Sequence, residues 1–101
     1  MADFRLQIIT QEKPVFDRQV VSIIAPGGLG YLGVLAHHAP LLTTLGSGRL
    51  QVRERPGREF VFQIAGGFLE VSSNAATILA DRLELLSAPE GERLDGQEGQ
   101  E

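Results

Sequence analysis

A glycine-rich run from Gly28 to Gly33 is the first candidate for chemistry, because it matches the G-x-G-x-x-G pattern of dinucleotide-binding sites. That pattern binds a pyrophosphate only where its glycines open a helix whose N-terminal amides face the ligand. Here the run leads on to Pro40, and a proline inside such a helix removes a hydrogen bond and costs about 3 kcal/mol. The sequence therefore argues against a nucleotide site at this run.

The adjacent His37 and His38 are the next candidates, either as metal ligands or as a catalytic base. Neighbouring side chains of an extended chain point to opposite sides, so the two rings are not expected to bind one ion together. No carboxylate lies close in sequence to orient either ring. Because Ala39 and Pro40 follow, a structural or interfacial role is favoured for His38 over a catalytic one.

The remaining groups that could do acid–base or nucleophilic chemistry give weak signals. Glu54 and Glu59 flank a hairpin tip, where charges are usually solvated. Asp81 and Glu84 follow the last expected strand and are typical of a helix start or of a surface, while Ser47 lacks the G-x-S-x-G context of an activated serine. The chain has no cysteine, which excludes a thiol nucleophile and a thiolate metal site. We expect a non-catalytic protein without a metal or cofactor.

Charge is distributed unevenly along the 101 residues, which are enough for one layered domain. The whole formal net charge of −4 falls in residues 88–101, and residues 1–87 are neutral. A neutral body has no electrostatic footprint for nucleic acid, and no stretch is long and apolar enough to span a bilayer. We expect residues 1–87 to form a soluble domain and residues 88–101 to form a flexible, disordered acidic tail.

The elements that position these residues are predicted to be strands, because apolar residues alternate with a period of two. Alternating or β-branched runs cover residues 4–8, 20–25, 49–53, 59–64, 68–71 and 77–80. Turn signals separate them, as at Arg55-Pro56-Gly57-Arg58, which is typical of a type II turn. Helical signals at residues 41–45 and 81–87 are too short for a stable helix. The pattern predicts an all-β, antiparallel sandwich or barrel.

The stretch from Gly30 to Leu45 is apolar, rich in glycine and almost uncharged. A small domain has a limited interior, so part of this stretch is expected at the surface, where contiguous apolar area commonly marks a protein partner. The alternative, that all of it is core, stays open at this point.

Four sequence blocks resemble the epsilon subunit of bacterial and chloroplast F-type ATP synthase, the counterpart of the mitochondrial delta subunit. They are Gly30-Tyr31-Leu32-Gly33-Val34-Leu35, His38-Ala39-Pro40-Leu41-Leu42-Thr43, Gly66-Gly67-Phe68-Leu69-Glu70-Val71 and Thr77-Ile78-Leu79-Ala80-Asp81. The resemblance covers residues 4 to about 84 and implies an antiparallel β-sandwich of about ten short strands. It also implies a non-catalytic rotor subunit that links the gamma subunit to the c ring during ion-driven rotation. The expected location is the cytoplasmic face of the bacterial inner membrane, or the stromal or matrix side in an organelle.

The resemblance assigns functional positions where the motifs match. The residues expected to face gamma are Thr10, His38, Ala39, Pro40, Leu41, Leu42 and Thr43. Those expected to face the c-ring loops are Gly30, Tyr31 and Leu32. Tyr31 stands where the family commonly has a glutamate, and it offers a ring face and a hydroxyl in place of a charge. His37 stands where glycine is common, so the shape of that loop is expected to differ.

Typical members of that family continue as two helices, which can inhibit ATP hydrolysis and in some cases bind ATP. Here only the acidic tail follows Ser87, so we expect no nucleotide and no latch-type inhibition. Because no stretch is long and apolar enough to span a bilayer, we also expect no direct membrane insertion. Two other hypotheses remain. One is a stand-alone small β-sandwich module that binds a protein or carbohydrate ligand, and the other is a small enzyme that uses His38 with Asp81 or Glu84.

Overall fold

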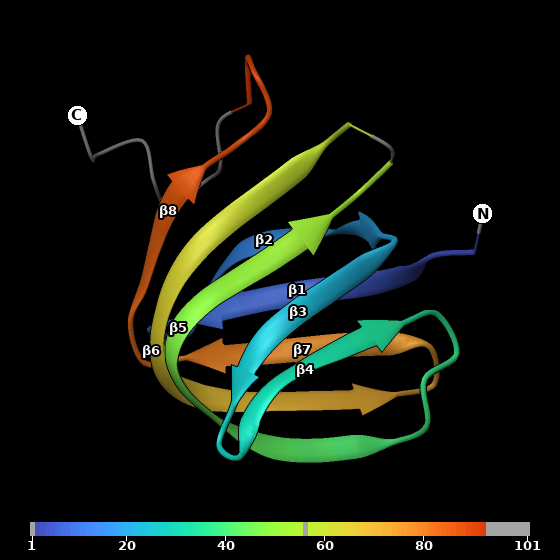
Figure 1. Cartoon of the computed structure of the whole chain (residues 1–101), viewed down its shortest axis with the longest axis vertical. Helices are drawn as coiled ribbons and strands as arrows, with labels where there is room; N and C mark the ends of the chain where they lie inside the picture. The colour runs from blue at the N-terminus through green and yellow to red at the C-terminus, as the bar shows by residue number, and fades with distance from the viewer. Residues whose placement is uncertain (1, 56, 93–101) are drawn as a thin grey trace.

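The computed structural model describes residues 2–55 and 57–92, which form strands and turns with no helix among them (Figure 1). The strands are β1 (Phe4–Thr10), β2 (Lys13–Val20), β3 (Ser22–Gly27), β4 (Gly30–Leu35), β5 (Leu41–Arg53), β6 (Glu59–Ser72), β7 (Ala75–Ala80) and β8 (Leu83–Ser87). In these residues there is consequently no helix with the length and apolarity needed to cross a membrane. The predicted all-β class is confirmed.

The two long strands β5 and β6 form a hairpin that curves through both layers of a sandwich (Figure 1). Their segments 41–45 and 67–72 join β7, β1 and β2 in one layer, which we call sheet I. Their segments 47–53 and 59–64 join β3, β4 and β8 in the other layer, which we call sheet II. Because both sheets share the hairpin, one continuous ladder of hydrogen bonds connects the two layers.

Two details differ from the expected sandwich of about ten short antiparallel strands. The described residues contain eight strands, because β5 and β6 each supply a strand to both sheets. The pairing of β1 with β7 is parallel, whereas the other pairings are antiparallel. The two segments with short helical signals also lie in strands, residues 41–45 in β5 and residues 83–87 in β8. Pairing with β6 therefore decides their conformation over local propensity.

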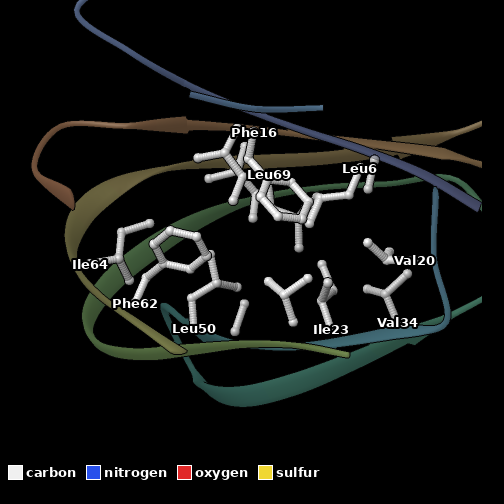
Figure 2. Packing of buried hydrophobic residues seen from close by; sticks show 14 of the residues in the cluster. Leu6, Phe16, Val20, Ile23, Val34, Leu50, Phe62, Ile64 and Leu69 are labelled. Carbon is white, nitrogen blue, oxygen red and sulfur yellow. The ribbon is translucent and has the colours of Figure 1, made fainter. Parts of the chain in front are cut away.

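The core lies between the sheets and is made by alternate residues of each strand. In β1, Phe4, Leu6 and Ile8 are buried, as their alternation predicts. Phe16 of β2 meets Phe60 and Phe62 of β6 edge to face, with ring centroids 5.2 and 6.1 Å away, an arrangement that aromatic rings prefer. Figure 2 shows the cluster from close by, with side chains of sheet I facing those of sheet II across a filled interior: Leu6, Phe16, Leu69, Ile23, Leu50 and Phe62.

The bend in β6 depends on two glycines. Gly66 and Gly67 have φ angles of +85° and +138°, in the range that favours glycine over other residues. A Cβ atom at Gly67 would overlap the carbonyl oxygen of Leu79, which is a backbone atom of the neighbouring β7 and cannot turn aside. The two glycines, which separate two predicted strands in the sequence, therefore form a bend inside the single strand β6.

The segment after β8 begins against the body of the sandwich. The Glu92 N–H group donates a hydrogen bond to the Pro89 carbonyl oxygen at 3.0 Å, and the Glu92 carboxylate accepts hydrogen bonds from Arg18 and Arg58. Residues 93–101, where the rest of the expected acidic tail falls, lie outside the described residues.

We predict that Gly67→Ala lowers the free energy of unfolding by about 2 kcal/mol or more, because it combines a left-handed φ with a backbone clash. Gly46→Ala is the matched control in β5, since a Cβ atom there meets nothing within 4 Å, and it should change the stability by less than about 0.5 kcal/mol. Urea unfolding followed by circular dichroism measures both. Equal stabilities of the two variants would contradict this account of the bend.

Candidate protein-binding site

The outer face of sheet I carries apolar side chains that are open to solvent. Phe68 of β6 is 51% exposed, Leu79 of β7 is 49% exposed and Leu42 of β5 is 72% exposed. The register pairs Phe68 with Thr44 on one side and Leu79 on the other, and pairs Leu79 with Ile9 of β1. Residues in register across a sheet share one face. These five residues form a continuous surface across four strands, which we call the sheet I face.

Polar and charged groups border the sheet I face. Glu70 lies between Leu42 and Thr77 in the register. At the β1–β2 edge, the Arg5 guanidinium donates two hydrogen bonds to the Asp17 carboxylate, at 2.8 and 2.7 Å, and this contact lowers the pKa of Asp17. Each charge of this pair neutralises the other. An apolar centre with a polar border is the usual anatomy of a protein-binding surface.

Phe68, Leu79 and Ile9 were not among the site residues predicted from the sequence. The signal that could have found two of them is strand alternation, because Phe68 is two residues before the polar Glu70, and Leu79 is two residues after the polar Thr77. An aromatic or aliphatic side chain at an outward position of a strand marks exposed apolar area.

The residues predicted to face gamma are spread over sheet I. Leu42 lies on the sheet I face, and Thr10 follows Ile9 at the end of β1. The exposed loop 38–40 lies at the opposite end, because pairing through β6 and β7 aligns its neighbour Leu41 with Leu6. Thr10 is four residues further along β1 than Leu6, which is about 13 Å. The structure thus brings Leu42 to the apolar surface and separates Thr10 from the His38 loop.

The loop between β4 and β5 is held in a defined shape. His37 has a left-handed φ of +66°, and its N–H donates to the Asn74 side-chain oxygen at 2.7 Å. The Asn74 amide in turn donates to the Asp3 carbonyl oxygen at 3.1 Å. The His38 N–H donates to the Leu35 carbonyl oxygen at 3.2 Å, and the His38 Nδ1 atom lies 2.7 Å from its neighbour's carbonyl oxygen. These contacts hold a backbone conformation that would otherwise favour glycine.

The geometry gives no support to catalysis at the histidines. Asp81 and Glu84 follow the end of β7, where Ala80 pairs with Thr10, and this is the end of sheet I away from His38. Across residues 2–55 and 57–92, no cluster of three or more histidine, aspartate or glutamate side chains could hold a metal ion. The interpretation of Glu54 as a solvated hairpin charge is wrong, because only 9% of it is exposed.

Gly30, Tyr31 and Leu32, predicted to face the c ring, lie together at the β3–β4 turn. They line a shallow hollow of about 280 Å³, which two of the residues predicted to face gamma, Leu41 and Thr43, also line. The turn is fastened to β5 by the hydrogen bond that the Gly28 N–H donates to the Thr44 carbonyl oxygen at 3.1 Å. The hollow is thus lined both by the residues predicted to face the c ring and by two of those predicted to face gamma.

Tyr31 spans from β4 to β5. Its hydroxyl oxygen accepts a hydrogen bond from the Arg49 N–H at 3.0 Å, although 59% of the residue is exposed. The ring lies near Gly48, where an added Cβ atom would overlap the Tyr31 hydroxyl and come within 3.0 Å of the Pro26 Cβ atom. Tyr31 therefore requires the absence of a side chain at Gly48.

We predict that Gly48→Ala displaces the Tyr31 side chain and increases its exposure to solvent. Tyr31 is the single tyrosine of a chain without tryptophan, so quenching of tyrosine fluorescence by acrylamide reports on this residue alone. Quenching should rise in Gly48→Ala and stay at the parent value in Gly46→Ala, where the new methyl group meets nothing within 4 Å. Unchanged quenching in both variants would show that the two residues do not depend on each other.

Comparison with known proteins adds three findings. The family model described as "ATP synthase, Delta/Epsilon chain, beta-sandwich domain" matches residues 3–86. The ATP synthase epsilon chains of Protochlamydia amoebophila and Moorella thermoacetica are 42% identical over 90 residues and 46% identical over 84 residues. These alignments cover 89% and 83% of this chain but 61% and 63% of the relatives. The chain therefore spans about three-fifths of the length of the curated relatives it matches.

Chains in two solved structures of ATP synthases also match this chain. A chain in the Euglena gracilis mitochondrial ATP synthase, in a structure of OSCP, F1 and c ring, matches with a TM-score of 0.79 and 25% identity, over 84% of this chain and 54% of that one. A chain in the central stalk and c ring of the Tetrahymena thermophila mitochondrial ATP synthase matches with a TM-score of 0.67, over 78% of this chain and 63% of that one. At 21% identity, the second match supports the fold alone.

Proposed function

We propose that the chain is a non-catalytic subunit of the rotor of an F-type ATP synthase. The premise is that the chain belongs to the ATP synthase delta/epsilon family, whose β-sandwich domain it contains. In this function it binds the gamma subunit and the loops of the c ring, and it connects the two during ion-driven rotation. It acts as a peripheral part of the F1 sector, on the cytoplasmic face of the inner membrane in a bacterium. The proposal assigns no nucleotide to the β-sandwich.

The observation that carries this proposal is the sheet I face. Phe68, Leu79 and Leu42 expose large apolar side chains in one continuous area, with Glu70 at its border. Binding energy at protein interfaces concentrates in apolar and aromatic side chains near the centre of such an area. We place the gamma subunit over the sheet I face and the adjoining loop 38–40. Thr10 follows Ile9 on β1, but it is in register with the buried Ala80, which sets it on the opposite side of sheet I from Ile9.

The β3–β4 turn is the proposed contact with the c ring. Tyr31 presents a ring face at this turn, and the neighbouring Leu29 is fully exposed. A chain that connects two partners under torque must be stiff between its two contact surfaces. The shared β5–β6 hairpin meets this requirement, because it pairs with β7 under the sheet I face and with β3 beside the turn. Close-packed interiors also have low compressibility and transmit strain.

We predict that Phe68→Asp weakens binding to a purified gamma–alpha–beta complex by about 30-fold or more, as the loss of a central apolar side chain does at interfaces. Leu86→Asp is the matched control, because Leu86 is also an exposed apolar strand residue, at 42%, but lies on β8 at the far edge of sheet II. Isothermal titration calorimetry measures both affinities. Circular dichroism first establishes that both variants keep the fold of the parent chain.

Equal loss of affinity in the two variants would remove gamma from the sheet I face. Failure of the parent chain to bind the complex, in calorimetry and in gel filtration, would overturn the proposed function itself. Binding of an unrelated protein or a carbohydrate by the parent chain, without binding to gamma, would support the stand-alone module instead.

The contact with the c ring is tested by cross-linking in the assembled complex. The chain has no cysteine, so a single introduced cysteine gives an unambiguous attachment point. We predict that Tyr31→Cys cross-links to the c subunit through a short bifunctional reagent, and that Arg55→Cys, at the β5–β6 turn, does not. Cross-linking from Arg55→Cys alone would reverse the proposed orientation of the sandwich.

A further inference from the structure

Four charged side chains form a closed ring at the end of the sandwich where β5 turns into β6. Arg18 of β2 donates hydrogen bonds to Glu54 at 3.1 Å and to Glu92 at 2.6 Å. Arg58 donates to the same two carboxylates, to Glu54 at 3.1 Å and to Glu92 at 2.7 Å. Each arginine bridges both carboxylates, and each carboxylate uses both oxygens. Charge-assisted hydrogen bonds of this kind are the stronger ones in proteins.

Arg18, Glu54 and Arg58 are held in position by contacts that do not involve Glu92. The Glu54 N–H donates to the Arg58 carbonyl oxygen at 3.0 Å, and the Arg58 N–H donates to the Arg55 carbonyl oxygen at 2.9 Å, so the turn itself holds Glu54 beside Arg58. The Arg18 guanidinium lies over the Phe60 ring, 5.1 Å from its centroid, and 5.5 Å from that of Phe16. The favourable contact between a cation and a ring face fixes Arg18 over the end of the core.

The charges of these three side chains do not balance. Two guanidinium groups face the single Glu54 carboxylate, whose side chain is only 11% exposed. The three groups therefore carry a net positive charge and leave guanidinium donors directed at the place that Glu92 occupies. Glu92 reaches this place from the segment after β8, which lies distant in sequence from both arginines. Hydrogen bonds from Arg18 and Arg58 lower the pKa of Glu92, so its carboxylate stays ionised.

We propose that Arg18, Glu54 and Arg58 form a carboxylate-binding site whose occupant is Glu92, and that this site fastens the C-terminal segment to the sandwich. The preceding carboxylate in the segment, Glu90, is exposed and makes no ion pair with the other described residues. The site thus selects one of two neighbouring glutamates, by position and not by charge. This inference stands apart from the proposed rotor function, since neither partner surface takes part in it.

The position of the site decides which end of the sandwich Glu92 contacts. Arg53 is the last residue of β5 before the turn, and Gly48, beside Tyr31, is five residues earlier on the strand, about 16 Å away. Glu92 is therefore fastened at the end of sheet II opposite the β3–β4 turn. The ring is partly open to water, with the Arg58 side chain 38% exposed and that of Glu92 22% exposed, so salt should loosen it.

The test uses nuclear magnetic resonance on the full chain, with the amide of Gly91 as a reporter that no variant alters. The ¹⁵N heteronuclear NOE of Gly91 should be close to that of the strands in the parent chain and in Glu90→Gln, the matched control. It should fall towards the values of a mobile segment in Glu92→Gln and in Arg58→Gln, because both break the ring. The double variant Arg58→Gln/Glu92→Gln should be no more mobile than either single one, since each removes the same contact.

Salt supplies a second readout. Raising NaCl from about 0.01 M to about 1 M shortens the Debye length from about 30 Å to about 3 Å. The Gly91 NOE should then fall in the parent chain and stay constant in Glu92→Gln. A Gly91 NOE in Glu92→Gln equal to that of the parent chain overturns the proposal, as does an equal fall in Glu90→Gln and Glu92→Gln. The strand amides, which must keep their chemical shifts in every variant, separate loss of the contact from loss of the fold.

Discussion

The close contact between Gly67 of β6 and the Leu79 carbonyl of β7 is the constraint on which the rest of the structure depends. It lets one long hairpin bend and supply strands to both sheets, in place of two hairpins joined by a turn. The layers are therefore linked through the backbone as well as through the side chains of the core. A chain of this size buries a limited apolar area, and such a link adds cohesion that a small core alone does not supply.

The same bend accounts for the outer surface. Past Gly67, side chains of β6 alternate between the core and the sheet I face, so the buried Leu69 fixes Phe68 in an outward position. Register then sets Leu79 and Thr44 beside it. A one-residue change at the bend would exchange the two faces of this strand. The exposed apolar surface is thus a direct consequence of how the hairpin is bent, and its position relative to the β3–β4 turn is set by the same strands.

How far the sequence predicts this structure differs from element to element. The alternation of Phe4, Leu6 and Ile8 gives both the strand and its buried face, because one side of β1 is apolar and the other polar. Phe68 and Leu69 are both apolar, so the contrast is weaker there: only the polar Glu70, two residues after Phe68, indicates which of the two faces outward. Contacts with β5 and β7 decide which one is buried. Glycines at positive φ resemble a turn locally, so the single strand β6 is predicted as two.

Glu54 marks a second limit of prediction. A glutamate beside a hairpin turn is expected in solvent, but Glu54 is buried here and accepts a hydrogen bond from Arg18, which is distant in sequence. Contacts of this kind leave no periodic signal, because each residue is ordinary in its own segment. Leu42 and the β3–β4 turn are predicted as site residues from the family resemblance and not from local patterns. A resemblance of this kind carries information about distant contacts, which local patterns lack.

Tyr31 shows how such contacts change the meaning of a substitution. In place of the glutamate common in the family, the chain has a ring that lies across to β5, and the space for it exists because Gly48 has no side chain. The Arg49 N–H group occupies one acceptor site of the hydroxyl, and none of the described residues accepts a hydrogen bond from the hydroxyl hydrogen. At the proposed contact with the c ring, this chain therefore offers an aromatic face and a neutral donor. Neutral contacts are not screened by ions. A contact with the c ring made through Tyr31 should therefore tolerate a salt concentration that would weaken a contact made through a carboxylate.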